Sequence, residues 1–183
     1  MKISDEMRKQ LNGQIAMEAN ASQTYLAMAS WAEQTGYGGA STFFYVQSAE
    51  ERDHMLRFIK YMNTIGAGAT IPAVAKPAAG SFESLEGILA ASLEYEQSTT
   101  KAIHGMVKTA QKDGDYSTLD FLNWFVREQV EEESMFEDLL QKFDVIGRDG
   151  IAINEIDKIL EAKGAASASL LTAATQSEPP AAQ

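Results

Sequence analysis

Hydrophobic and polar positions alternate with helical spacing over two long stretches of the chain, residues 1–71 and 78–178. Apolar side chains recur there every three or four positions, and neither stretch shows the sustained alternation of a β-strand. The four prolines lie outside both stretches, at Pro72, Pro77, Pro179 and Pro180. The pattern therefore predicts an all-α protein whose helices are separated mainly by glycines and capping residues.

Turn and capping signals divide the chain into four long helices and one short helix. The predicted helices cover roughly these ranges: 5–33, 40–65, 81–111, 116–143 and 152–163. Ser81 is expected to cap the third helix. The segment 67–80 contains two prolines and is too long for a tight turn, which predicts a crossover along the bundle. The sequence thus favours an up-and-down four-helix bundle with a long connection between helices two and three.

Composition separates this bundle from the end of the chain. Residues 1–163 carry the helical pattern and are expected to form one domain. Residues 164–183 are dominated by Ala, Ser, Thr and Pro, so we expect a flexible tail there.

Polar side chains interrupt the apolar stripes of the helices at one level. On the first, second and fourth helices the stripe is apolar at both ends and carries in its middle Glu18, Glu51, His54, Gln129 and Glu132. On the third helix Glu94 lies among small residues and is expected at the same height. Several buried carboxylates repel one another, and no Lys or Arg lies on these stripes, so the pattern favours a bound pair of metal ions.

The types of ligand narrow the choice of metal. Glu51 and His54 are three residues apart and emerge from one face of the second helix. One imidazole among carboxylates suits iron or manganese better than structural zinc. A Glu-x-x-His pair alone is common on solvated helices, and Glu131 to Glu133 alone is typical of a surface; it is the coincidence across several helices that indicates a site.

Charge and cysteine content exclude several classes of function. The chain has 26 acidic and 15 basic residues, a net charge of −11, which disfavours nucleic acid and favours cations as partners. It has no cysteine, which excludes thiolate metal sites and disulfides. No apolar run reaches the ~20 residues of a membrane span. The N-terminus lacks an apolar signal region, so a cytoplasmic protein is expected, or an organellar one if a transit peptide has been removed.

Several motifs resemble those of the ferritins, and of their bacterial non-haem branch in particular. Residues 49–54 resemble the Glu-Glu-Arg-x-His segment of the second ferritin helix, and residues 123–133 resemble the fourth helix of bacterial ferritins. Glu18 followed by Tyr25 is similar to the first helix, and Leu93-Glu94 to the third. The likeness extends over about residues 5–163 and implies the ferritin-like bundle with a short fifth helix.

The resemblance also implies a ligand set. A first iron would lie between Glu18 and His54, and Glu51 would bridge it to a second iron bound by Glu94. Two further side chains would accompany the second iron, namely Gln129 and Glu132.

Other positions beside this pair carry implied roles. Tyr25 could supply an electron to reduced oxygen species, or be a core tyrosine with a satisfied hydroxyl. Glu50, Glu128 and Glu131 would form a third iron site, or simply a solvated acidic flank. Haem is not expected, because Arg52 lies in the stretch where bacterioferritins carry their haem methionine.

The function implied by the resemblance is iron storage with ferroxidase activity. Fe(II) and O2 would be the substrates, and the ferric product would be deposited inside a hollow homo-oligomeric shell of twenty-four subunits. A stand-alone di-iron oxidase acting on an organic substrate is the first alternative, and it would require an apolar cavity beside the metals. A purely structural bundle is the second alternative.

Overall fold

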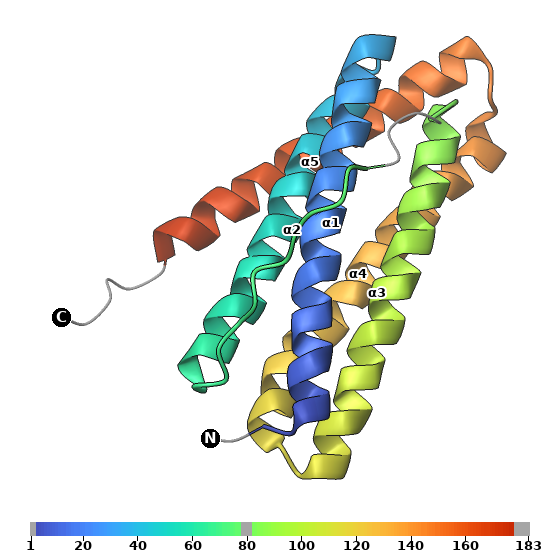
Figure 1. The fold of residues 1–183 in the computed structure, drawn as a ribbon. Coiled ribbons are helices and arrows are strands. Elements are labelled where there is room, and N and C mark those ends of the chain that lie inside the picture. The colour runs from blue at the N-terminus through green and yellow to red at the C-terminus, as the bar shows by residue number, and fades with distance from the viewer. Residues whose placement is uncertain (1–2, 78–81, 178–183) are drawn as a thin grey trace.

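The computed structural model describes residues 3–77 and 82–177, and it is helical almost throughout (Figure 1). The helices are α1 (Asp5–Thr35), α2 (Gly38–Thr64), α3 (Leu85–Asp113), α4 (Tyr116–Ile146) and α5 (Gly150–Ser177). No strand occurs in the described residues. The predicted all-α bundle with a long crossover between α2 and α3 is confirmed.

Local signals in the sequence explain where the helices begin and end. Ser4 caps α1 by accepting a hydrogen bond from the Met7 amide, and Ser84 caps α3 in the same way through Gly87. Gly36 and Gly114 end α1 and α3 with φ values of 89° and 65°, a left-handed conformation that favours glycine. Ser81, the cap expected from the sequence, lies outside the described residues.

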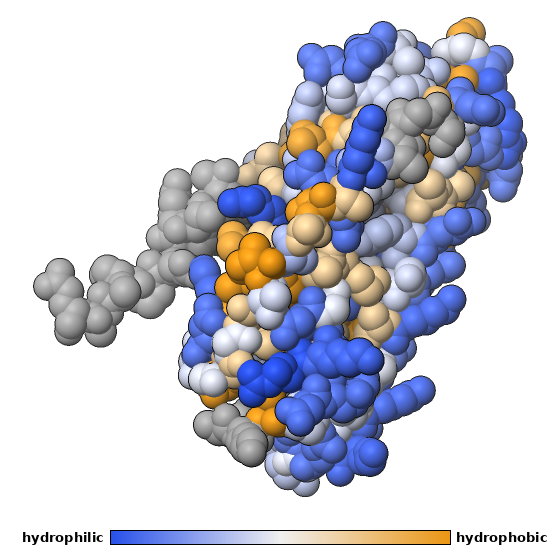
Figure 2. Space-filling view, in the orientation of Figure 1, coloured by the Kyte–Doolittle hydropathy of each residue, from blue (hydrophilic) through white to orange (hydrophobic). Residues whose placement is uncertain are grey.

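The crossover follows the surface of the bundle and is attached to α1. The Thr70 amide donates to Asn12 Oδ1 at 2.8 Å, and the Ala75 amide donates to Asn20 Oδ1 at 3.1 Å. The segment exposes Ile71 (69%) and Val74 (46%), and the face in Figure 2 shows apolar side chains gathered near its middle. This face of the single chain is therefore partly apolar.

Two apolar clusters fill the interior of the bundle. One cluster includes Tyr25, Phe44 and Phe136 and lies at the end of the bundle that α5 packs against. The other includes Leu11 and Phe58 and lies at the opposite end, near the start of α1. Buried polar side chains separate the two clusters, and this layer is the candidate site. None of the helices in the described part of the chain combines the length and apolar character that a membrane span requires.

Helix α5 is longer than the sequence predicts and runs back along α2 (Figure 1). Asp157 of α5 accepts hydrogen bonds from the Gly39 and Ala40 amides at 3.0 and 2.7 Å, and so caps α2 from outside. A Cβ at Gly39 would lie 1.9 Å from the Asp157 carbonyl oxygen, so this crossing requires glycine. The helix continues to Ser177, so the expected helix end at residue 163 is wrong. Of the flexible tail expected at residues 164–183, residues 164–177 are helical and the rest lie outside the described residues.

Candidate metal centre

All four helices of the bundle contribute to the polar layer. Its innermost members have exposed fractions of 8% or less: Glu18, Gln47, Glu51, His54, Glu96, Gln129 and Glu132. Such a layer inside an apolar core is costly unless its groups are paired, protonated or bound to a cation.

Three of these side chains converge closely. Glu18 of α1 and Glu51 and His54 of α2 each offer a ligand atom, and the three atoms lie within 4.8 Å of one another. Glu51 Oε2 is 3.5 Å from His54 Nδ1, as expected for residues three apart on one helix. Trp124 and Phe125 of α4 pack edgewise on the His54 ring, with centroids 5.4 and 5.8 Å away, and limit its rotation.

The electrostatics of the layer favour a bound cation. Burial, followed by the charge of Glu51, raises the pKa of Glu18 well above its ordinary value. Burial and then the charge of Glu96 raise the pKa of Glu51 and that of Glu132 in the same way. Glu18 Oε2 and Glu132 Oε2 are buried and have no hydrogen-bond partner within the described residues. Oxygen atoms left unpaired among like charges, with one imidazole beside them, fit a divalent cation such as Fe(II).

The third helix presents a different residue from the one expected. Glu94 is exposed, and Glu96 is the buried carboxylate of α3, with 1% of its surface exposed. Residues two apart lie about 200° apart around a helix, so only one of them can point inward. The placement of Glu94 inferred from the sequence was wrong. A regular three–four spacing could have identified Glu96, because the inner face of α3 reads Leu85, Leu89, Ser92, Glu96, Thr99 and Ile103.

Glu96 is held by neighbours from two other helices. The Tyr25 hydroxyl donates to Glu96 Oε1 in a short hydrogen bond, and Gln129 Nε2 donates to Glu96 Oε2 at 3.1 Å. Gln129 and Glu132 point into the layer from α4, as the stripe on that helix predicted. Both oxygens of this carboxylate therefore accept hydrogen bonds from other helices, whereas Glu18 accepts at Oε1 from Gln14 Nε2 of its own helix, at 2.8 Å, and has a free Oε2.

Tyr25 is a core residue with a buried polar end. Its ring stacks on Phe44 and Phe136, with centroids 5.8 and 6.3 Å away. Burial and then the charge of Glu96 raise the pKa of the Tyr25 phenol well above its ordinary value. The phenol thus stays protonated and donates to the layer.

The acidic flank predicted beside the layer is only partly buried. Burial raises the pKa of Glu50 to about 7, and Gln47 donates a short hydrogen bond to its carboxylate. Glu128 Oε1 lies 4.0 Å from His54 Nε2, whereas Glu131 is exposed. Gln47, one turn before Glu51 on the buried face of α2, was not among the predicted site residues. Its Oε1 is buried and has no partner within the described residues.

Comparisons with known proteins agree with this geometry. Residues 8–146 match the ferritin-like domain. A probable bacterial non-heme ferritin-like protein of Haemophilus influenzae is 37% identical over 86% of this chain and 95% of its own length. A bacterial non-heme ferritin of Staphylococcus aureus is 38% identical over 88% of this chain and 96% of its own. An open pore ferritin of Archaeoglobus fulgidus superposes with a TM-score of 0.84 at 34% identity, covering 88% of this chain and 98% of that one. The chain therefore belongs to the ferritin family, in its bacterial non-haem branch.

Proposed function

We propose that the chain stores iron, and that it binds two Fe(II) ions between its four helices and oxidises them with dioxygen. The observation that carries the proposal is the meeting of Glu18, Glu51 and His54 within 4.8 Å, inside an otherwise apolar core. The names of the relatives support iron as the metal.

The two Fe(II) ions are substrates in this proposal. Glu18 and His54 bind the first ion, and Glu51 bridges it to a second ion held by Glu96, with Glu132 and Gln129 beside it. The balanced step is 2 Fe²⁺ + O2 + 2 H⁺ → 2 Fe³⁺ + H2O2. The carboxyl groups, whose pKa values burial raises, release their protons when the cations enter, and negative ligands then favour Fe(III) over Fe(II).

Tyr25 is the proposed donor of an additional electron. Its phenol passes a proton to Glu96 along their hydrogen bond and an electron to the reduced oxygen species formed from dioxygen, which leaves a neutral tyrosyl radical. Without that proton acceptor the oxidised phenol would be a buried cation, which the apolar stacking partners disfavour.

The acidic flank is the proposed binding site for iron after it leaves the buried pair. This flank consists of Glu50 on α2 and of Glu128 and Glu131 on α4. Two of these side chains, Glu50 and Glu128, lie near the His54 imidazole. They form a third iron site between the buried pair and a stored ferric mineral.

Storage of a mineral requires an enclosed volume, so we include a hollow homo-oligomeric shell in the proposal. The resemblance to ferritins implies twenty-four subunits. The exposed Ile71 and Val74 on the crossover support burial of that face against another copy.

The alternative is a stand-alone di-iron oxidase with an organic substrate. A cavity of about 290 Å³ does adjoin Tyr25, which is near the lower limit for small-molecule sites. None of the carboxylates lines it, so an organic molecule bound there would not touch the metals.

Native mass and bound iron, measured before and after aerobic addition of Fe(II), separate these functions. We expect a particle many times the 19.9 kDa chain, which takes up far more iron than two ions per chain. A monomer or dimer that stops at two ions per chain contradicts storage and favours the oxidase.

A further inference from the structure

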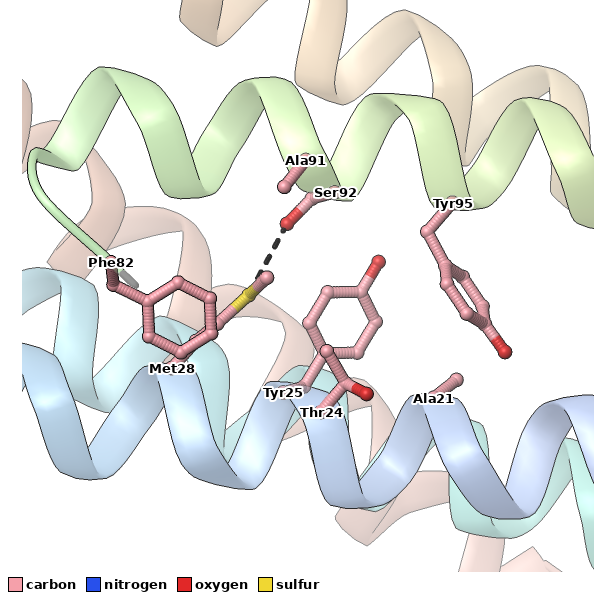
Figure 3. A pocket seen from close by; sticks show the side chains of 8 residues that line it. All are labelled: Ala21, Thr24, Tyr25, Met28, Phe82, Ala91, Ser92 and Tyr95. Atoms are coloured by element: carbon pink, nitrogen blue, oxygen red, sulfur yellow. Dashed lines mark hydrogen bonds between the residues drawn. The ribbon is translucent and has the colours of Figure 1, made fainter. Parts of the chain in front are cut away.

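A cavity of about 290 Å³ lies between α1 and α3 (Figure 3). It adjoins the polar layer through Tyr25, which lines the cavity and donates to Glu96. Tyr25 and Met28 of α1, Ala91 and Tyr95 of α3, and Phe82 before α3 form most of its wall. Figure 3 shows the Tyr25 ring rising from α1 toward α3, and the Tyr95 ring reaching from α3 toward α1. The cavity is thus walled largely by aromatic and aliphatic surface.

Four hydroxyl groups also line the cavity, and each of them already donates to an acceptor of the chain. The donations are Thr24 to Asn20 O (2.8 Å), Ser92 to Ile88 O (2.9 Å), Tyr95 to Met17 O (2.5 Å), and Tyr25 to Glu96. Ser92 additionally contacts the Met28 sulfur at 3.6 Å, drawn as the dashed line in Figure 3. Water needs two to four polar partners to remain in such a space, and these four hydroxyl groups can only accept from it, because their protons are already engaged. A small apolar molecule meets no such requirement.

The two tyrosines separate the cavity from the metal centre. Their ring centroids are 6.3 Å apart in an edgewise arrangement. Tyr25 donates to Glu96, and Tyr95, which precedes Glu96 on α3, donates to the carbonyl oxygen of Met17, next to Glu18 in the chain, so both rings lie close to the carboxylates. A molecule in the cavity is therefore one aromatic side chain away from the proposed iron pair.

We propose that this cavity is a binding site for dioxygen, from which the gas reaches the iron pair past Tyr25 and Tyr95. The inference rests on the proposed function, since dioxygen is the oxidant of that reaction. Dioxygen is apolar and partitions from water into an apolar space, so a cavity with these walls raises its concentration beside the carboxylates. Fe(II) is charged and finds no ligand among these walls, so the two substrates approach the centre by separate routes.

Xenon binds in apolar cavities without reacting, so it tests whether the cavity holds a small apolar guest independently of Fe(II) oxidation. Crystals of the wild-type protein under xenon pressure should show an atom between Tyr25, Met28 and Tyr95. The Ala91→Leu variant, whose longer side chain enters the cavity from an exposed position on α3, should lose that atom. The Ala90→Leu variant makes the same change at an exposed residue that does not line the cavity, and should keep it.

The role of the cavity is tested by initial rates of Fe(II) oxidation at several dioxygen concentrations. Ala91→Leu should raise the dioxygen concentration for half-maximal rate by about three-fold or more, with the maximal rate and the Fe(II) dependence unchanged. Ala90→Leu should match the wild type. An empty cavity under xenon, an unchanged dioxygen dependence in Ala91→Leu, or a loss of maximal rate in that variant each overturns the proposal.

The same measurements separate this inference from the function on which it rests. If the wild type does not oxidise Fe(II) at any dioxygen concentration, the proposed function fails and the dioxygen site fails with it. If the wild type oxidises Fe(II) but Ala91→Leu behaves like Ala90→Leu, only the dioxygen site fails.

Discussion

The two halves of the polar layer hold their carboxylates in different states. On the α1–α2 side, Glu18, Glu51 and His54 converge within 4.8 Å, and Glu18 Oε2 has no hydrogen-bond partner within the described residues. On the α3–α4 side, Glu96 already accepts hydrogen bonds from Tyr25 and Gln129. The ligand atoms of the first half thus already lie close together, and Glu18 Oε1 accepts only from Gln14 of its own helix. In the second half, donors from two other helices occupy both oxygens of Glu96.

This difference suggests an order of binding. In the proposed function, the first cation replaces the protons that Glu18 and Glu51 retain at raised pKa, and it breaks no hydrogen bond between helices. The second cation must compete with the Tyr25 and Gln129 donors for the oxygens of Glu96. If the proposed function holds, we expect the α1–α2 half to bind first and more tightly.

The largest expected effect comes from removing the residue that serves both halves. Glu51→Ala should slow rapid Fe(II) oxidation by on the order of 100-fold or more, beyond the range typical of groups that only support a ligand. Stopped-flow absorbance measures the rate, and circular dichroism should show unchanged helix content. Glu94→Ala is the matched control, because Glu94 is an exposed glutamate in the same bundle and should oxidise iron normally. Wild-type kinetics in Glu51→Ala, or a comparable loss in Glu94→Ala, contradicts the site.

A smaller, selective effect is expected when each half is altered by itself. Calorimetric titration with Zn²⁺, which is not oxidised, should show that His54→Ala loses the tighter site. Glu96→Ala should keep that site within about three-fold of its affinity and lose the weaker one, with oxidation slowed by about 10-fold or more. Equal loss of both sites in both variants would mean that the two halves are not distinct.

The smallest expected effect is on the stability of the metal-free protein. The pKa values of Glu18, Glu51 and Glu132 are raised by burial, and that of Glu50 rises from 4.5 to about 7. Below pH 4.5 these groups are protonated in both states; above it the unfolded chain releases protons that the folded chain retains, so stability falls as pH rises. For Glu50 the fall lies between pH 4.5 and 7, and for the other three it continues until each folded pKa is passed.

Melting temperatures at pH 5 to 8 test this expectation. A pKa displacement of one unit equals about 1.4 kcal/mol, which is roughly 3–5 °C for a chain of this length. Glu18→Gln should make the decrease in melting temperature between pH 5 and 8 smaller by roughly 3–5 °C. Glu94→Gln should leave this decrease unchanged, and bound Zn²⁺ should turn it into an increase. A melting temperature that rises steadily from pH 5 to 8 without metal would show that the carboxylates are neutralised within the chain.

Much of the site could be predicted because helix periodicity constrains it. Glu18, Glu51, His54, Gln129 and Glu132 lie on stripes whose apolar ends extend for two or three turns, so the inward face was unambiguous. The predicted inward orientation of Glu94 was wrong, because the small residues around it are compatible with either face of α3. The longer reach of α5 was missed because a segment rich in Ala and Ser has little apolar pattern, and the structure places it against α2 through close contacts at Gly39 and Gly164.

The sequence by itself determined the features that depend on one helix at a time. These are where each helix begins and ends and, for most helices, which face is buried. Caps such as Ser4 and left-handed glycines such as Gly36 act within a few residues of the chain, so local reasoning reaches them. Only the tertiary structure decided which polar groups meet. That Tyr25 donates to Glu96, or that Asp157 caps α2, depends on how helices far apart in the sequence pack, because hydrogen bonds between side chains require distances that no single helix fixes.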